Sequence, residues 1–324
     1  MMKKQILAVL AGAVLALGML SGCQLPGTSE PQPQTEEETQ PAPPPSDPGF
    51  PAQVDFGEDT VTVEKKPQHI VALTPDYAEL VLDLDGEGVL CGVGDLCGAV
   101  LDVHAPAMGT PEKLDVEAVI AAQTEYLLTS SPLREDQKSQ LEEAGVQVLT
   151  EAPPSDRDAA ESRIQHTAEL LYGQETNKGR ELSEQLQSDL EKIMEQVAVY
   201  QNVVAQQQTA VLLAWPDRTI ATGDTWEGML LEDLGLENLG RDGEGWSVPE
   251  DTALSPDVIL YDKSIAPEQI TESKTYADSP AVKNDKLYAV DLARIQRQGS
   301  GMVQEVQAVA QALYPEAFSG SAGK

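Results

Sequence analysis

Residues 175–206 read ETNKGRELSEQLQSDLEKIMEQVAVYQNVVAQ and contain no proline. Apolar residues recur in this segment at spacings of three or four, at Leu182, Leu186, Leu190, Ile193, Val197, Tyr200 and Val204, and most other positions are polar. This spacing predicts one long amphipathic helix. A coiled coil is the disfavoured alternative, because only about three heptads are present.

Both sides of this helix show the alternation of an α/β fold. Apolar runs typical of buried strands lie at 69–74, 89–94, 126–130, 146–152, 209–215, 219–223, 257–262 and 286–291. Helical patterns follow them, one beginning at Pro75 and the others at 115–123, 133–144, 156–172, 224–234 and 301–313. Strands that alternate with helices in this way favour largely parallel sheets with helices on both faces.

The predicted architecture is therefore two Rossmann-like α/β lobes, residues 50–174 and 207–318, joined by the single helix 175–206. Ligands of open α/β sheets bind outside the carboxyl ends of the strands, so a ligand cleft is expected between the lobes. Residues 319–324 are expected to form a disordered tail.

The N-terminus is typical of an exported protein. Lys3 and Lys4 precede an apolar stretch, and Leu20-Ser21-Gly22-Cys23 follows it. This order predicts a signal peptide over residues 1–22, and Leu-Ser-Gly-Cys resembles the lipobox of bacterial lipoproteins. The resemblance implies cleavage before Cys23, lipid on Cys23 and an extracytoplasmic protein anchored to the cell membrane; an ordinary signal peptide or an uncleaved anchor is the alternative. Residues 23–49, rich in Pro and Glu, are predicted to be a disordered tether.

Charge and motifs exclude several functions. With 21 Lys+Arg against 54 Asp+Glu, the formal net charge is −33, which disfavours binding to nucleic acid or to anionic lipid through a basic surface. Gly92-Val93-Gly94 lacks the third glycine of a dinucleotide fingerprint, because Cys97 stands there. Gly299-Ser300-Gly301 lacks the first glycine of a nucleophile elbow. We therefore expect no enzyme.

Cysteine and histidine give no metal motif. Cys91 and Cys97 belong to no zinc-ligand pattern, and a disulfide between them is permitted but not favoured. His69, His104 and His166 share no motif either, although His104 follows Cys97 closely enough to be an axial ligand to a bound metal centre. The prediction is no protein-bound metal and no cofactor.

Seven segments carry a resemblance to a known family. They are FGEDTVTVEKKPQHIVALTPDYAELV, VLCGVGDLCGAVLDVHAPAMG, DVEAVIAAQTEYLL, GDTWEGMLLEDLGLENLG, SPDVILYD, PAVKNDKLYAVD and ALYPEAF. In this order they resemble the extracellular solute-binding proteins of ABC importers for iron–siderophores, haem and cobalamin. The resemblance implies a monomer that delivers a metal chelate or corrinoid to an ABC permease and its ATPase subunits. The alternative is a non-transport sensor or adhesion lipoprotein with the same fold.

Loops that follow the predicted strands supply the candidate ligand-binding residues. These are Asp76, Tyr77, Asp95, Cys97, Ser130, Ser131, Trp215, Trp226, Trp246, Arg294 and Arg297. Indole rings can pack on the flat face of a macrocycle or chelate. Arg297 matches a family position that often faces the ligand, but Gly301 and Met302 stand where a second Arg is common. Because ferric catecholates are highly anionic and need several basic donors, a corrinoid or a hydroxamate chelate is favoured.

Two glutamates are candidates for docking to the permease. The resemblance aligns Glu117 with the family's N-lobe glutamate that pairs with an Arg of the permease. Its counterpart in the second lobe is Glu250, which is one position out of register because Pro249 occupies the matching place. A helix-start acid such as Glu117 can also be an ordinary response to the helix dipole.

Overall fold

The computed structural model describes residues 47–57, 59–202 and 207–319. All of them belong to one compact unit, Pro45–Lys324. The predicted signal peptide, Cys23 and nearly all of the predicted tether lie outside the described residues.

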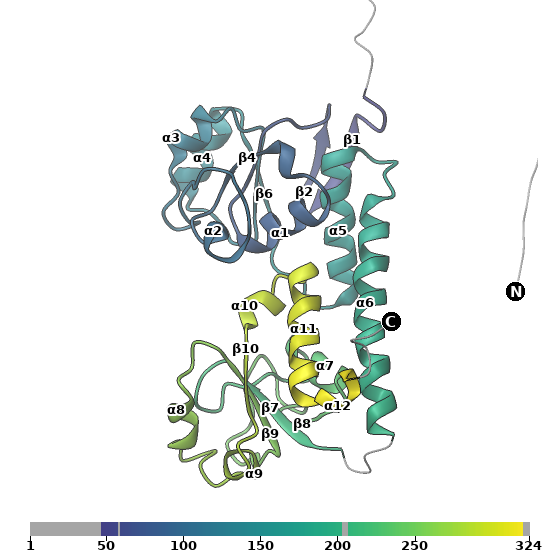
Figure 1. Cartoon of the computed structure of the whole chain (residues 1–324). Helices are drawn as coiled ribbons and strands as arrows, with labels where there is room; N and C mark the ends of the chain where they lie inside the picture. The colour runs from purple at the N-terminus through teal and green to yellow at the C-terminus, as the bar shows by residue number, and fades with distance from the viewer. Residues whose placement is uncertain (1–46, 58, 203–206, 320–324) are drawn as a thin grey trace, which may run out of the picture. The chain divides into compact units, whose positions relative to one another are not determined.

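The first lobe begins with a hairpin and contains a four-stranded parallel sheet (Figure 1). In the hairpin, β1 (Ala52–Phe56) pairs antiparallel with β2 (Asp59–Val63). The sheet has the order β4–β3–β5–β6 and consists of β3 (Ile70–Ala72), β4 (Leu90–Val93), β5 (Tyr126–Thr129) and β6 (Gln147–Thr150). All four residues of the central strand β5 are buried, as expected for a parallel strand that helices cover on both faces.

Helices alternate with these strands; four of the five were predicted, whereas the short α2 lies where a loop was expected. They are α1 (Pro75–Asp83), α2 (Cys97–Val100), α3 (Val116–Ala121), α4 (Glu135–Glu143) and α5 (Arg157–Tyr172), with a 3-10 turn at Glu87–Val89. Pro75 occupies the first turn of α1, where a missing N–H costs nothing. The Asp156 side chain accepts a hydrogen bond from the Ala159 N–H at 2.9 Å and caps α5.

The long helix is α6, which spans Lys178–Gln201 and packs beside α5 and α11 (Figure 1). Its buried side chains include Leu186, Leu190, Ile193 and Val197, members of the predicted apolar face. The predicted range 175–206 is longer at both ends, and residues 203–206 lie outside the described part of the chain.

The second lobe repeats the parallel arrangement. Its sheet has the order β10–β9–β7–β8 and consists of β7 (Thr209–Leu213), β8 (Glu237–Asn238), β9 (Val258–Asp262) and β10 (Leu287–Val290). Its helices are α7 (Trp226–Asp233), α8 (Pro267–Thr271), α9 (Pro280–Lys283), α10 (Leu292–Ile295), α11 (Ser300–Leu313) and α12 (Pro315–Phe318).

The predicted strand at 219–223 is wrong. Residues 214–218 are too few for a parallel crossover, which needs a dozen or more residues. The chain instead folds back on β7, with isolated antiparallel bridges from Ile220 to Leu213 and from Thr219 to Ser247. The short strand β8 takes the place beside β7.

Alternate strand residues face different cores. On β3, Ile70 and Ala72 join a cluster that also contains residues of α6, α11 and the second lobe, whereas Val71 joins a separate cluster with Leu127. The second lobe has its own outer cluster around Val211 and Tyr276. The helical layer formed by α5, α6 and α11 therefore joins both sheets in one core. Within the described ranges, no helix is long and apolar enough to cross a membrane.

Candidate functional site

Exposed apolar side chains lie at the carboxyl ends of strands in both lobes. Leu96 and Val100, one turn apart at α2, follow β4 and are 62% and 43% exposed. In the second lobe Trp215, two residues beyond β7, is 65% exposed. Figure 1 shows α2 and α10 on the facing sides of the two lobes. These large apolar side chains lie in water at the usual ligand position of α/β sheets, which makes this face the candidate site.

The predicted N-lobe residues at the start of α1 are buried. The Asp76 carboxylate is 2.6 Å from Arg163 Nη2 and accepts a hydrogen bond from Ser130 Oγ at 3.1 Å. The Tyr77 hydroxyl donates to Glu151 at 3.0 Å, and the Arg163 guanidinium lies 3.9 Å from the centre of the Tyr77 ring. Burial, the largest influence, raises the pKa of Tyr77. These contacts form a packed polar network in which neither Asp76 nor Tyr77 reaches the surface.

In the loop after β4, one of the two predicted residues is buried, and an exposed apolar residue was not predicted. Cys97 is fully buried, and burial raises the pKa of its thiol to about 11, so the thiol stays protonated at neutral pH. Asp95 is exposed and accepts the Gly109 N–H at 2.8 Å. The side chain that projects into solvent between them is Leu96, which was not predicted. Its spacing of four from Val100 is the signal that could have identified it.

The three tryptophans have different environments. Trp215 is exposed, whereas Trp226 is half-buried with its Nε1 3.2 Å from Met302 Sδ. Trp246 is half-buried in a tight turn at a φ of 66°, which is unusual for a bulky residue. The backbone N–H of Trp246 donates to Thr222 Oγ1 at 3.1 Å, and the backbone N–H of the preceding Gly245 donates to Asp224 at 2.9 Å. These bonds hold the turn in its strained conformation.

Arg297 lies in a buried joint between the lobes. We use "interlobe joint" for Glu79 and Asp83 of α1 together with Arg297, Ser300 and Gly301 of the second lobe. Arg297 Nε bonds Glu79 Oε2, and Glu79 Oε1 accepts the Gly301 N–H at 2.6 Å. Asp83 accepts hydrogen bonds from the Ser300 N–H at 2.8 Å and from its hydroxyl at 2.7 Å. The N-cap of α11 is Gly299, which has no side chain, so carboxylates of the other lobe cap this helix.

The second candidate arginine is also engaged. Arg294 Nη2 donates to Gln304 Oε1, and its Nη1 lies 3.7 Å from Glu305. In this structure neither predicted arginine presents a free guanidinium. Because Arg297 is buried, its guanidinium is not accessible to a ligand in this structure.

The predicted docking glutamates are both exposed. Glu117 lies in the first turn of α3, which Asp115 caps by accepting the Ala118 N–H at 3.0 Å. Glu250 is the second residue of a turn closed by the Thr252 N–H and the Pro249 carbonyl at 3.1 Å. Arg218 Nη2 donates to the carbonyls of Pro249 at 2.6 Å and Thr252 at 3.0 Å, which fixes this turn. Neither glutamate carboxylate has a hydrogen bond or an ion pair among the described residues.

The histidines and cysteines of the described residues form no metal-binding cluster. Cys91 and Cys97 are free thiols. His104 is exposed, 3.8 Å from Glu87, and the His166 ring lies 6.4 Å from that of Phe56. No group of three or more His, Cys, Asp or Glu that could hold a metal ion occurs in residues 47–57, 59–202 and 207–319.

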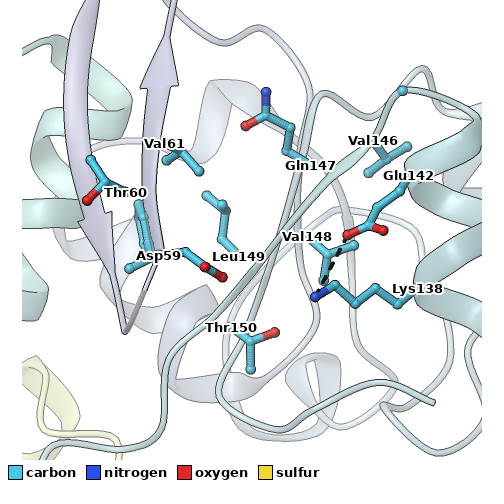
Figure 2. Close-up of a pocket in the computed structure, with 12 residues that line it drawn as sticks. Asp59, Thr60, Val61, Lys138, Glu142, Val146, Gln147, Val148, Leu149 and Thr150 are labelled. Atoms are coloured by element: carbon cyan, nitrogen blue, oxygen red, sulfur yellow. Dashed lines mark ion pairs between the residues drawn. The ribbon is translucent and has the colours of Figure 1, made fainter. Parts of the chain in front are cut away.

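A cavity of about 470 Å³ lies between the hairpin and the edge strand β6 of the first sheet (Figure 2). Its walls come from β2 and β6, and Lys138 and Glu142 of α4, 3.8 Å apart, line it as well. None of the predicted site residues lines this cavity.

Comparison with known proteins gives relatives over nearly the whole chain. An uncharacterized ABC transporter substrate-binding lipoprotein of Bacillus subtilis (strain 168), YvrC, is 26% identical over 333 residues, which cover 98% of this chain and 99% of the relative. Among solved structures, the fold is similar to that of the periplasmic heme-binding protein RhuT from Roseiflexus sp. RS-1 in apo form. That match has a TM-score of 0.62 at 18% identity and covers 78% of this chain and 99% of RhuT.

The periplasmic vitamin B12 binding protein BtuF of Vibrio cholerae has a similar fold, with a TM-score of 0.55 at 15% identity over 78% of this chain and 98% of BtuF. These likenesses confirm the two-lobed α/β architecture. The family model described as periplasmic binding protein matches residues 70–292, more than half of the chain. This match confirms the resemblance found in the sequence, and the chain belongs to the periplasmic binding protein family.

Proposed function

We propose that this protein is the lipid-anchored substrate-binding component of an ABC importer, and that it carries a corrinoid or a ferric chelate between its two lobes. Family membership supports a binding role, and the name of the Bacillus relative supports an ABC transporter and a lipoprotein. The observation that carries the proposal is the exposure of Leu96 and Val100 on one lobe and Trp215 on the other.

The apolar character of these side chains suits a ligand with a broad apolar face. Such a ligand buries their surface at about 25 cal/mol per Å², while its polar groups remain near the loops. Solved structures of similar fold are named as binding heme or vitamin B12, and both molecules have such a face.

The basic side chains near the strand ends are already paired. Lys263 lies 2.5 Å from Asp291, Arg294 contacts Glu305, and Arg297 bonds Glu79. Highly anionic chelates require several charge-assisted hydrogen bonds. This pairing favours a corrinoid or a hydroxamate chelate over a ferric catecholate.

A panel of ligands tests the proposal. Cobalamin, cobinamide, haem, ferric hydroxamates, ferric catecholates and bare metal ions are added to the mature protein, and tryptophan fluorescence and the melting temperature are measured. A ligand that binds only the folded state stabilises it by about 2.7 kcal/mol at a hundredfold excess over Kd. We expect a corrinoid or a hydroxamate chelate to raise the melting temperature. If no member of the panel does so, the sensor or adhesion alternative is favoured.

Truncation of the exposed tryptophan tests the site. We expect Trp215→Ala to weaken binding of the panel hit by about tenfold or more, because truncating an aromatic anchor commonly costs over 1 kcal/mol. Isothermal titration measures Kd, with Leu96→Ser as a second variant on the other lobe. The control is Val199→Ser on α6, where the side chain is 69% exposed and belongs to no loop that follows a strand. Equal affinities of Trp215→Ala, Leu96→Ser and the control would rule out this site.

Replacement of the docking glutamates tests delivery to the permease. We expect the double variant Glu117→Gln/Glu250→Gln to lower ligand uptake by about tenfold or more and to leave ligand affinity unchanged. Exposed charges orient docking and speed association more than they add affinity. Uptake is measured in cells that carry the cognate permease, and Glu143→Gln is the control, because Glu143 is equally exposed. Unimpaired uptake in the double variant would exclude a docking role.

A further inference from the structure

A second cavity, of about 250 Å³, lies among α5, α6, α7 and the start of α11. The residues that line it fall into a buried group and an exposed group. Ile164, Leu186, Leu190 and Met302 are at most 8% exposed, and the half-buried Trp226 contributes one wall. Because α5 belongs to the first lobe and α7 to the second, an occupant of this cavity would touch both lobes. Figure 1 shows α6 running beside α5 and α11.

Two polar atoms in the cavity lining are buried without a hydrogen-bond partner in the described part of the chain. They are Gln298 Oε1 and Ser183 Oγ. Gln298 is 9% exposed, and its Nε2 donates to the Pro154 carbonyl at 3.0 Å. Because only the NH₂ side of the amide can donate to a carbonyl, this bond fixes which atom remains free, and that atom is an acceptor. Leaving a buried acceptor without a donor costs free energy. We therefore expect this oxygen to meet a hydrogen-bond donor.

Charged residues at the mouth of this cavity restrict the charge of a molecule that can enter it. The exposed lining residues include the acids Asp158, Glu161 and Glu191. The one base among the lining residues, Arg157, is paired with Asp233. The mouth is therefore acidic and repels anions.

We propose that this cavity is a second binding site, which takes a small neutral molecule with an apolar ring or short chain and one hydrogen-bond donor. The apolar part packs against Trp226 and the leucines of α6, and the donor bonds Gln298 Oε1. Because a cavity of about 150 Å³ holds benzene, this one has room for a substituted ring. A corrinoid or a tetrapyrrole is far too large, so the site is separate from the one proposed at the strand ends and does not depend on it.

Three probes of similar shape test the donor and the charge. Binding of 4-ethylphenol, ethylbenzene and 4-ethylbenzoate to the mature protein is measured by isothermal titration, with intrinsic tryptophan fluorescence as a second signal. We expect 4-ethylphenol to bind about tenfold tighter than ethylbenzene, and 4-ethylbenzoate to bind most weakly. Equal affinity for the phenol and the hydrocarbon, or no binding of either at millimolar concentration, would overturn the proposal. The second result would mean that water alone occupies the cavity.

Two variants locate the bound probe. Gln298→Met keeps the length of the side chain and removes the acceptor, so it should abolish the preference for the phenol. Leu190→Phe fills the cavity and should abolish binding while Gln298 stays intact. If either variant fails to fold, a crystal structure with 4-ethylphenol must show its hydroxyl within hydrogen-bond distance of Gln298 Oε1. Phenol binding that survives both folded variants, or density elsewhere, contradicts this site.

Discussion

We expect Glu79→Ala to lower the free energy of unfolding by about 3–5 kcal/mol, because it leaves the Arg297 guanidinium buried without its counter-charge. The two side chains are 4% and 6% exposed, so water cannot replace the lost carboxylate. The same change removes the acceptor of the Gly301 N–H. Urea unfolding followed by circular dichroism measures the difference.

Two further variants separate charge from packing at the interlobe joint. Glu79→Gln keeps an acceptor for Gly301 and should be less destabilising than Glu79→Ala. Glu143→Ala is the matched control on an exposed glutamate, and a change within about 0.5 kcal/mol is expected there. A loss in Glu79→Ala no larger than that in the control would show that the buried pair adds nothing to stability.

The interlobe joint explains why the role of Arg297 could not be read from sequence. Arg297 and Glu79 are separated by 218 positions, and no local pattern specifies a pair at that distance. A guanidinium in a loop that follows a strand is equally compatible with a ligand contact and with a buried ion pair. The sequence indicates Arg297 as a candidate, and the fold pairs it with Glu79 of the other lobe.

The fold was more predictable than the site, because its signals are local. The run YLLT at 126–129, for example, is apolar and bounded by polar residues, and these features mark a buried parallel strand. The edge strand β8 was missed because Glu237 and Asn238 form no apolar run. At 219–223 the apolar pattern was present, but the short connection from β7 permits only an antiparallel return.

The loops of the candidate site were predictable, whereas the orientations of their side chains were not. Asp95 and Cys97 were chosen by residue type, yet the exposed apolar residue between them is Leu96. Cys97 has a small side chain that points inward from α2. Its Sγ lies 3.8 Å from the Ala72 carbonyl oxygen. Which of two adjacent residues faces inward depends on how α2 sits on the sheet, and composition does not encode that.

We expect Asp76→Ala also to lower the free energy of unfolding at pH 7 by about 3–5 kcal/mol, because Arg163 then remains buried without its counter-charge. Burial is the largest influence on the pKa of Asp76 and raises it. The Arg163 charge and hydrogen bonds from Thr74, Arg163 and Ser130 together outweigh burial and hold that pKa below its ordinary value. An acid with a lowered folded pKa adds stability that is complete above its unfolded pKa and is lost as the pH falls through its folded pKa.

The difference in stability between the native protein and Asp76→Ala should therefore depend on pH in one direction. It should be constant from pH 7 to about 5 and shrink below about 4, near the unfolded pKa of an aspartate. Urea unfolding at several pH values measures it. Asp102→Ala, an exposed aspartate without a hydrogen bond or ion pair in the described ranges, should show neither the loss nor the pH dependence. A difference that grows on acidification would have the wrong sign for an ionised Asp76 and would mean that the pair with Arg163 does not stabilise the fold.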